Sequence, residues 1–437
     1  MINSTTEEYY RNYCGAHLAK YIQNAQDTRF NYILMFIIIC ILLATIALAQ
    51  PLFASVNNKT GGETVVYSPP PNNSIIINRK IFEQNIKAKY RTNQIVFPAA
   101  GIAHIKKVKY INSKPVRINI AEINTNVNPN LKIQPQIASN KLNAKSTVRK
   151  IAQKSGSIVA INGGFFKPQT GVPLGALMID GKVLTGSIYN RVGIAIFEEN
   201  NTTSFKMANI EFEINALTKN NKVKIDNINQ PRMLQSYLLL YTSDWGKIIP
   251  APPKTGWNMI IRDKKVIKIT ANPTEIEEND MVLQGNKDIL SKLAQDKEID
   301  IDIQLQDGLK GAQHIISAGP YLVKDSKIYV DTQTQRLQAI SGKNPRSAIG
   351  YKNDGTLIIV TVDGREEASV GMTLRELAVL MKNLGCDYAM NFDGGSSSAM
   401  YINGHIANRA VNKEGIAISN ALTVTEINSQ ETRLAGI

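Results

Sequence analysis

One uncharged, apolar run near the N-terminus constrains this chain more than any other feature. Residues 33–49 contain a single polar side chain, that of Thr45, and no charged residue occurs between Arg29 and Lys59. A helix of this length is just long enough to cross about 30 Å of hydrocarbon. A helix buried in a globular domain would normally keep a polar face. Residues 30–49 are therefore predicted to form a transmembrane signal anchor.

The charges around this run predict its orientation. Lys20 and Arg29 precede it, whereas only Lys59 follows closely, and this weak bias keeps residues 1–29 in the cytoplasm. The rest of the chain, which carries the whole net charge of +14, is then extracytoplasmic, in the periplasm or at the cell surface. A small-x-small sequence ending at Ala49 leaves signal cleavage open, in which case the protein is secreted.

Composition excludes several classes of site and partner. Three cysteines without a C-x-x-C pair cannot build a disulfide framework or a thiolate zinc site, and four histidines are too few to suggest an all-His/Cys metal site. No cofactor is predicted. Asp and Asn oxygens leave a Ca²⁺ ion open as a ligand, although the sequence has no D-x-D-x-D loop. Export argues against nucleic acid as a partner, and the sequence leaves the oligomeric state open.

A linker and one large domain follow the apolar run. Residues 57–74 combine paired glycines, three consecutive prolines and several asparagines, a composition that is typical of linkers. Residues 50–98 are therefore assigned to a linker and N-terminal extension. Residues 99–428 are assigned to the folded domain, and residues 429–437 to a C-terminal tail.

Within the domain, apolar β-branched segments separated by Gly, Asn and Asp turns predict strands. Thr373-x-x-Glu376 is a capping box that opens a helix, with Gly385 placed at its C-terminal cap. Strands are predicted on both sides of this helix, at 355–362 and 387–392. A helix followed by a strand whose exit is polar and rich in glycine favours an α/β (mixed α+β) fold with its site at the strand ends.

Three loops share one construction, in which an apolar strand is followed by Asn or Asp and then by glycine. They are Asn162-Gly163-Gly164-Phe165-Phe166, Asp363-Gly364-Arg365 and Asn391-Phe392-Asp393-Gly394-Gly395. Glycine permits positive φ and lets a ligand approach the backbone closely. Each loop taken alone is also typical of a hairpin turn. After the third loop, however, Ser396, Ser397 and Ser398 add hydroxyl and N–H donors that suit a phosphate.

Arg346 is a candidate phosphate ligand. It lies in the segment Asn-Pro-Arg-Ser-Ala-Ile-Gly at 344–350, just before an apolar strand. If it projects from the end of a sheet, its planar guanidinium suits a bidentate contact with phosphate. A lone arginine is also a common solvated surface residue, so this geometry alone does not decide between the two interpretations.

Taken in order, these motifs resemble the phosphodiester glycosidase family. The similar segments are AINGGFF (160–166), GALMIDGK (175–182), SAGPYLVKD (317–325), NPRSAIG (344–350), VDGR (362–365), GMTLRELAVLMKNLG (371–385) and NFDGGSSSAM (391–400). The resemblance covers about residues 100–426. It implies a membrane-anchored hydrolase that cleaves the glycosidic bond of a sugar-1-phosphodiester, with a sugar like N-acetylglucosamine, in cell-envelope or exopolysaccharide metabolism.

The resemblance also implies roles for individual residues. Asp393 is expected to be the nucleophile or base, with Asp363 second, because glycoside cleavage usually employs two carboxylates. The phosphate is assigned to two arginines and to the turn that follows Asp393, namely Arg346, Arg365, Gly394, Gly395, Ser396 and Ser397. The sugar is assigned to Asn162, Gly163, Gly164, Phe165 and Asn391.

This sequence departs from the family pattern at two places. Ser396 stands where the family usually has a third glycine, and segment 415–422 lacks the arginine that often precedes its closing Asn-Ala-Leu. These departures concern substrate specificity more than fold. An alternative function is a non-catalytic module that binds envelope polysaccharide or teichoic acid. Retention of Arg346, Asp363 and Asp393 together favours the enzyme, because a pure binder needs no convergent carboxylates.

Overall fold

The computed structural model describes residues 72–230, 238–254, 256–296 and 298–427. Residues 70–437 form one compact unit, and the hydrophobic clusters of the described residues lie within it. This unit therefore contains the apolar core that its folding needs. The predicted anchor at 30–49 and the tail at 429–437 fall outside the described residues. Within the described ranges, no helix is long and apolar enough to cross a membrane.

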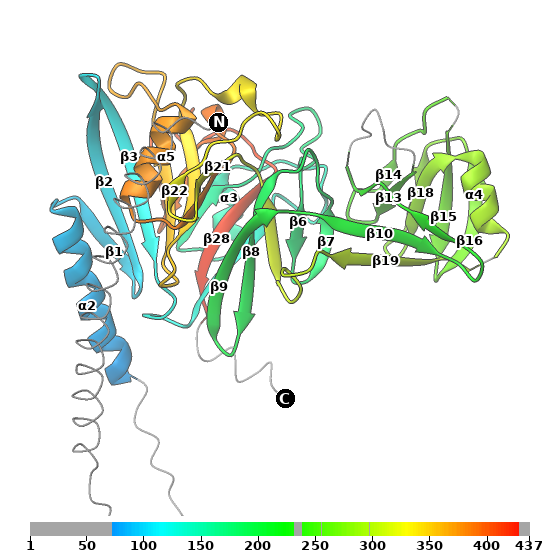
Figure 1. The fold of residues 1–437 in the computed structure, drawn as a ribbon, viewed down its shortest axis with the longest axis horizontal. Coiled ribbons are helices and arrows are strands. Elements are labelled where there is room, and N and C mark those ends of the chain that lie inside the picture. The colour runs from blue at the N-terminus through cyan, green and yellow to red at the C-terminus, as the bar shows by residue number, and fades with distance from the viewer. Residues whose placement is uncertain (1–71, 231–237, 255, 297, 428–437) are drawn as a thin grey trace, which may run out of the picture. The chain divides into compact units, whose positions relative to one another are not determined.

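A central antiparallel sheet of eight strands organises this unit (Figure 1). In spatial order its strands are β1 (Ile95–Ala99), β2 (Ile102–Ile111), β3 (Lys114–Ile123), β24 (Leu357–Val362), β23 (Arg346–Tyr351), β25 (Tyr388–Asn391), β21 (Tyr321–Lys324) and β22 (Lys327–Ile328). Every residue of β23 and β24 is buried. Consecutive residues of β24, Ile359 and Val360, point to opposite faces and belong to two different hydrophobic clusters, so both faces of the sheet are covered.

Two five-stranded sheets share the hydrophobic cluster on one of these faces. The first contains β27 (His405–Ile406), β26 (Met400–Ile402), β5 (Val159–Asn162), β28 (Asn420–Glu426) and β4 (Leu131–Ile137). The second contains β7 (Lys182–Thr185), β6 (Leu177–Ile179), β20 (His314–Ser317), β8 (Val192–Glu199) and β9 (Thr202–Asn209). Ile161 of β5 and Ile194 of β8 pack in one cluster with Ile359. The core therefore lies between the sheets.

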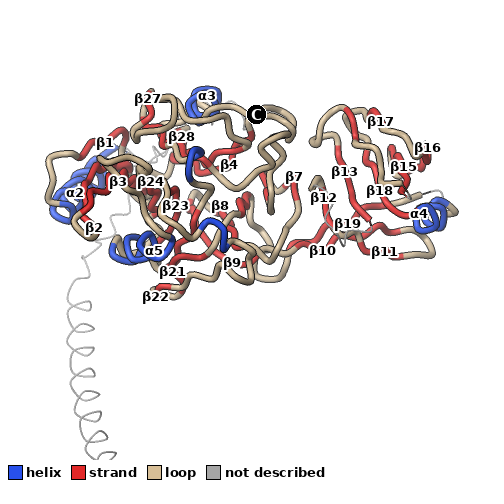
Figure 2. Tube along the Cα trace, turned by 90° about the horizontal axis from the view of Figure 1, so that it is seen from above, coloured by secondary structure: helices blue, strands red, loops and turns tan. Residues whose placement is uncertain are grey.

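Helices cover the outer faces (Figure 2). Helix α2 (Asn72–Tyr90) and helix α5 (Leu374–Asn383) pack on the second face of the central sheet, for example through Phe82 and Leu377. Helix α3 (Val148–Lys154) packs on the sheet of β5 through Ile151. Since α2 and β1 pack on this core, the compact unit begins before the predicted boundary at residue 99.

An insertion separates β9 from β20 in the sequence. It leaves along β10 (Phe212–Leu217) and returns along β19 (Asp300–Leu305), and these strands pair side by side in antiparallel register (Figures 1 and 2). Its other elements are β11 (Lys222–Lys224), β12 (Asn227–Ile228), β13 (Leu238–Thr242), β14 (Ile248–Ile249), β15 (Gly256–Arg262), β16 (Lys265–Thr270), β17 (Thr274–Glu275), β18 (Met281–Asn286) and α4 (Lys287–Ala294). The insertion has a hydrophobic cluster of its own.

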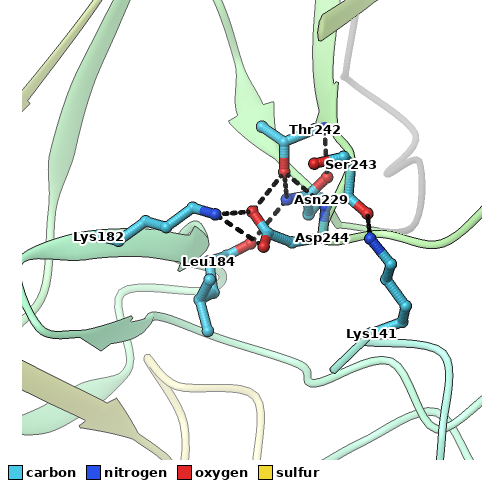
Figure 3. A network of polar contacts seen from close by, with 7 residues as sticks. All are labelled: Lys141, Lys182, Leu184, Asn229, Thr242, Ser243 and Asp244. Carbon is cyan, nitrogen blue, oxygen red and sulfur yellow. Dashed lines mark hydrogen bonds and ion pairs between the residues drawn. The ribbon is translucent and has the colours of Figure 1, made fainter. Parts of the chain in front are cut away.

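Polar contacts fasten the insertion to β7 (Figure 3). The Lys182 ammonium donates to Asp244 Oδ1 at 2.8 Å. The Asn229 side-chain amide donates to the carbonyl oxygen of Leu184, also at 2.8 Å. These contacts tie β7 to the segments that follow β12 and β13. The predicted hairpin turn at residues 180–182 joins β6 to β7, so it also holds a strand that contacts the insertion.

The predicted α/β fold is wrong. The described residues form 28 strands, nearly all in antiparallel sheets, and only four α-helices. Helix α5 does carry its capping box and does connect β24 to β25, as predicted. However, β23 lies between those strands and pairs antiparallel with both. The prediction followed from one strand–helix–strand unit, β24–α5–β25, which looks like part of an α/β protein. Antiparallel strand pairs build most of the rest of the fold.

Candidate active site

The three predicted loops meet around one turn. The backbone N–H of Asp393 donates to the carbonyl oxygen of Gly163 at 3.0 Å, which joins the loop after β25 to the loop after β5. Nη1 of Arg365, in the loop after β24, donates to Ser396 Oγ at 3.4 Å. Residues 393–398 are therefore the centre of the site, and the 3₁₀ turn Gly395–Ser397 forms their middle part.

Asn162 and Asn391 are buried, and their side chains hydrogen-bond to the protein around the site. The Asn162 side-chain amide donates to the Asp393 carbonyl oxygen at 2.6 Å, and its Oδ1 accepts from Ser347 Oγ at 2.6 Å. The Asn391 amide donates to the Gly319 carbonyl oxygen at 2.9 Å. The buried Oδ1 of Asn391 has no hydrogen-bond partner among the described residues. Both residues were predicted to contact the sugar, and the contacts observed fix the loop that carries Asp393.

Gly163 and Gly164 are packed against Asn420, at the start of β28. Their N–H groups donate to the carbonyl oxygen and to Oδ1 of Asn420, each at 2.9 Å. A Cβ on Gly163 would lie 2.1 Å from Asn420 Oδ1, and a Cβ on Gly164 would lie 2.4 Å from the Ser317 carbonyl oxygen. Close packing therefore requires both glycines, which were assigned to the sugar, and their N–H groups already donate to Asn420.

Gly163→Ala should disturb the packing around the site and lower the stability of the protein. The added methyl must displace Asn420 or Ile316, and overpacking of this kind typically costs about 1–3 kcal/mol of folding free energy. Because Gly163 also accepts from the Asp393 N–H, Asp393 should shift with it. Thermal unfolding checks the stability, with Gly342→Ala as the control, since a Cβ on Gly342 meets nothing within 4 Å and its φ lies outside the left-handed region. An unchanged midpoint for Gly163→Ala would contradict the packing argument.

Asp393 faces a cavity of about 420 Å³. The cavity is lined by Phe165 and Phe166 and by Lys145, Pro168, Asp393, Ser397, Ile416 and Ala417. Gly394 N–H donates to Asp393 Oδ1 at 2.9 Å and holds the carboxyl in place. Burial raises the pKa of Asp393 to about 6, although hydrogen bonds from Ser397 and Gly394 and the charge of Arg191 oppose this shift. Asp393 can therefore exchange a proton near neutral pH.

The other side of the same turn borders a second cavity, of about 370 Å³. Its lining includes Gly395, Ser396 and Ser398 together with Arg365 and Arg409. Arg365 is exposed, and its Nη2 donates to Asn344 Oδ1 at 2.8 Å, which orients the guanidinium. Arg365 beside the half-buried Ser396 and the N–H groups of the turn suits an anion such as phosphate, whereas the Arg409 guanidinium donates to Glu366 Oε2 at 2.7 Å.

Arg346 lies in a different environment from Arg365. It is buried, its Nε donates to the Met372 carbonyl oxygen at 2.8 Å, and its Nη2 donates to the carbonyl oxygens of Ile340, at 2.7 Å, and of Gly342. Burial lowers the pKa of Arg346 to about 10, and the charge of Arg365 acts in the same direction. These contacts tie its guanidinium to the backbone and favour Arg365 as the arginine that is open to a ligand.

Asp363 lies behind the second cavity. It is buried, its Oδ1 accepts the Arg409 N–H at 3.0 Å, and burial raises its pKa. The Ser369 hydroxyl donates to the Asp363 carbonyl oxygen at 2.6 Å. Asp363 therefore positions the segment that carries Arg409, whereas Asp393 lines a cavity.

Sequence reasoning missed Arg191, which directly precedes β8. Arg191 is buried, it stacks at 4.8 Å on the Phe165 ring, and its Nε has no hydrogen-bond partner among the described residues. Burial lowers its pKa to about 10, and the nearby Asp393 charge opposes this shift. The sequence did contain a pattern that could have identified it. Arg191 follows Asn190 and is followed by an apolar run, just as Arg346 follows Pro345 and is followed by one.

Arg409 and Asn420 were also missed. Arg409 is exposed and follows no glycine-rich turn, so only its contacts across the fold reveal it. Asn420 opens the strand β28, and its pairing with the Gly163 loop joins residues that are far apart in the sequence. No group of three or more His, Cys, Asp or Glu side chains that could hold a metal ion occurs within the described ranges.

A partly buried aspartate in an aromatic-lined cavity, beside a cavity bordered by arginines, is an arrangement suited to hydrolysis of an anionic glycoside. Comparison with known families agrees with this class. Residues 242–425 match the model of the phosphodiester glycosidase family. The resemblance inferred from the sequence is thereby confirmed. The matched range contains Asp363, Arg365 and Asp393, whereas the loop after β5 lies outside it.

Curated relatives match over shorter segments. The chain is 37 % identical over 134 residues to the SPbeta prophage-derived uncharacterized protein YomE of Bacillus subtilis, and this match covers 31 % of this chain and 20 % of that protein. It is 29 % identical over 103 residues to the mouse N-acetylglucosamine-1-phosphodiester alpha-N-acetylglucosaminidase, covering 23 % of this chain and 20 % of the enzyme. The chain therefore matches about a fifth of the length of these relatives.

Solved structures share the fold. A hypothetical protein from Synechocystis aligns with a TM-score of 0.68 at 21 % identity, covering 75 % of this chain and 62 % of that one. A protein from Burkholderia pseudomallei K96243 aligns with a TM-score of 0.60, also at 21 % identity, covering 72 % of this chain and 74 % of that one. At this identity the likeness concerns the fold alone.

Proposed function

We propose that this chain hydrolyses the glycosidic bond of a sugar-1-phosphodiester, with a sugar like N-acetylglucosamine. The observation that carries the proposal is the turn at 393–398, which has Asp393 in an aromatic-lined cavity on one side and Arg365 with Ser396 in a second cavity on the other. A sugar ring can stack on Phe165 while the phosphate lies by Arg365. The similarity to the mouse phosphodiester glucosaminidase supports the same substrate class.

Hydrolysis of a sugar-1-phosphodiester needs a well-placed carboxylate more than it needs a general acid. When the bond between C1 and the phosphate oxygen breaks, the electron pair goes to that oxygen and leaves a phosphate monoester, which is a good leaving group without protonation. Asp393 then has two possible tasks. As a base it takes a proton from the water whose oxygen bonds to C1, and as a nucleophile it bonds to C1 itself and water later cleaves the ester.

The remaining residues would bind and orient the substrate. Arg365 and the N–H groups of the 394–397 turn would stabilise the charge on the departing phosphate, and Arg409 borders the same cavity. Arg191 would favour the ionised form of Asp393 and would hold Phe165 by stacking on its ring. Arg346 would hold the loop at 340–342 through its backbone contacts.

Turnover is tested with residues 70–437 and a chromogenic or mass-tagged N-acetylglucosamine-1-phosphodiester. Release of the free sugar and a phosphate monoester is expected. Binding of the substrate without release would instead favour the non-catalytic polysaccharide- or teichoic-acid-binding module. The anomer first formed, followed by NMR, distinguishes the two tasks of Asp393, because a covalent intermediate retains the configuration at C1 and direct attack by water inverts it.

The pH dependence should follow the ionisation of Asp393. Its pKa of about 6 means that the carboxylate required of a base or nucleophile is complete only above that pH. We expect kcat/KM to fall about tenfold per pH unit below 6 and to level off above it. A phosphodiester stays ionised over this range, so the titration belongs to the enzyme. A rate that rises as the pH falls through 6 would assign Asp393 the role of an acid instead.

The proposed location is outside the cytoplasm, with one N-terminal helix in the membrane and the catalytic unit acting on cell-envelope or exopolysaccharide material. The support comes from the uncharged run at 30–49 and the basic residues that precede it. Protease added to intact cells stripped of any outer barrier should digest the unit. Protection of residues 99–428 under these conditions would contradict export.

A further inference from the structure

The positive charge of this chain is concentrated in one part of the structure. Residues 77–117 contain ten basic residues and one acidic residue, Glu83, so they carry nine of the 14 net positive charges. The segment comprises most of α2, all of β1 and β2, and the start of β3. The remainder of the chain is far closer to neutral, which sets this segment apart as a local feature.

Most of these charges are directed to solvent. Arg79 pairs with Glu83, and Lys89 pairs with Glu122. Six exposed lysines have no acidic partner within the described ranges, namely Lys80, Lys87, Lys106, Lys107, Lys109 and Lys114. The ammonium groups of Lys87 and Lys107 lie 5.6 Å from the Phe97 ring and 5.7 Å from the Tyr90 ring. Lysines of α2 and β2 therefore border the same packed region.

Helix α2 also presents apolar side chains to solvent. Its inner face buries Phe82, Ile86 and Tyr90 against the central sheet. One turn apart on its outer face, Ile77 and Ile81 remain 59 % and 51 % exposed. An exposed pair of isoleucines flanked by lysines offers the two contacts that hold a protein on an anionic bilayer, apolar insertion and charge attraction. We call α2 with Lys107 and Lys109 of β2 the basic face.

We propose that the basic face docks on an anionic lipid bilayer. The inference rests on the predicted anchor and does not depend on catalysis. Only 22 residues separate the end of the apolar run at Ala49 from the start of α2, a span of at most about 75 Å, so the face can reach the bilayer. A soluble anionic polymer would use the charge but would leave Ile77 and Ile81 without a role. Docking would hold the catalytic unit against the membrane surface.

Vesicle co-sedimentation of residues 70–437, which lack the apolar run, tests this proposal directly. We expect binding to vesicles that contain phosphatidylglycerol and little binding to pure phosphatidylcholine vesicles. Binding should weaken at about 1 M salt, where the Debye length falls to about 3 Å. Ile77→Ser with Ile81→Ser should also weaken it, because the inserted apolar contact is lost.

Two matched lysine variants complete the test. Substituting Gln for Lys80, Lys87, Lys107 and Lys109 should weaken binding about tenfold or more, since each lysine near an anionic surface contributes roughly a fivefold factor. The same four changes at Lys254, Lys265, Lys268 and Lys292, in the insertion, should have little effect, and thermal unfolding confirms that both variants fold. Equal loss in both variants, no binding to anionic vesicles, or binding only to a soluble polyglycerol phosphate would overturn the lipid proposal. None of these outcomes depends on turnover.

Discussion

Asp393→Asn should abolish turnover and leave the fold intact. The change removes the carboxylate that lines the cavity at 393–398 and keeps its size and shape. Loss of a charge that acts in the transition state typically lowers the rate by about 10²-fold or more, several kcal/mol of activation free energy. Single-turnover kinetics on a sugar-1-phosphodiester measure the effect. Near-normal turnover would remove Asp393 from the mechanism and promote Asp363.

The stability of the same variant provides an independent check. Because burial raises the pKa of Asp393 to about 6, its ionisation opposes folding. That penalty is absent below the unfolded pKa of about 4 and complete once the pH exceeds 6. Asn carries no charge, so at pH 7 the variant should be at least as stable as the wild type, by up to about 1 kcal/mol after solvent screening. A variant that is inactive because it is unfolded would show the opposite.

The local features of the site could largely be predicted from the sequence. The capping box of α5, the strands on both sides of it and the hairpin turn at 180–182 are encoded by a few neighbouring residues. The Asn/Asp–Gly pattern also identified the loops of Asn162, Asp363 and Asp393, which the structure brings together. These loops can be recognised in the sequence because each one depends on the backbone conformation of its own glycine.

The features that were missed depend on pairing between distant segments. The strand β23 comes between β24 and β25 and turns an apparent α/β unit into an antiparallel sheet, and no residue near α5 specifies this. In the same way, Asn420 supports the Gly163 loop from a strand more than 250 residues later. Burial also changes roles, because Arg346 and Arg365 look alike in the sequence but only Arg365 is exposed.

Arg365 should distinguish a phosphodiester glycosidase from an ordinary glycosidase. If its guanidinium contacts the phosphate, Arg365→Ala should lower kcat/KM for the phosphodiester about 10- to 150-fold, which corresponds to about 1.5–3 kcal/mol for a charge-assisted hydrogen bond. A nitrophenyl glycoside of the same sugar has no phosphate and should be affected far less. Arg365→Lys should rescue only part of the loss, because a point charge cannot reproduce the planar fork.

Two comparisons make the Arg365 result decisive. Arg375→Ala removes an exposed arginine from α5, outside both cavities, and should leave both substrates unaffected. Arg346→Ala should damage both substrates about equally, because the Arg346 guanidinium binds the carbonyl oxygens of Met372 and Ile340 and so orders the loop. If Arg365→Ala also reduced both substrates equally, Arg365 would be a loop-ordering residue through Asn344 and Ser396, and the phosphate would have to be bound elsewhere.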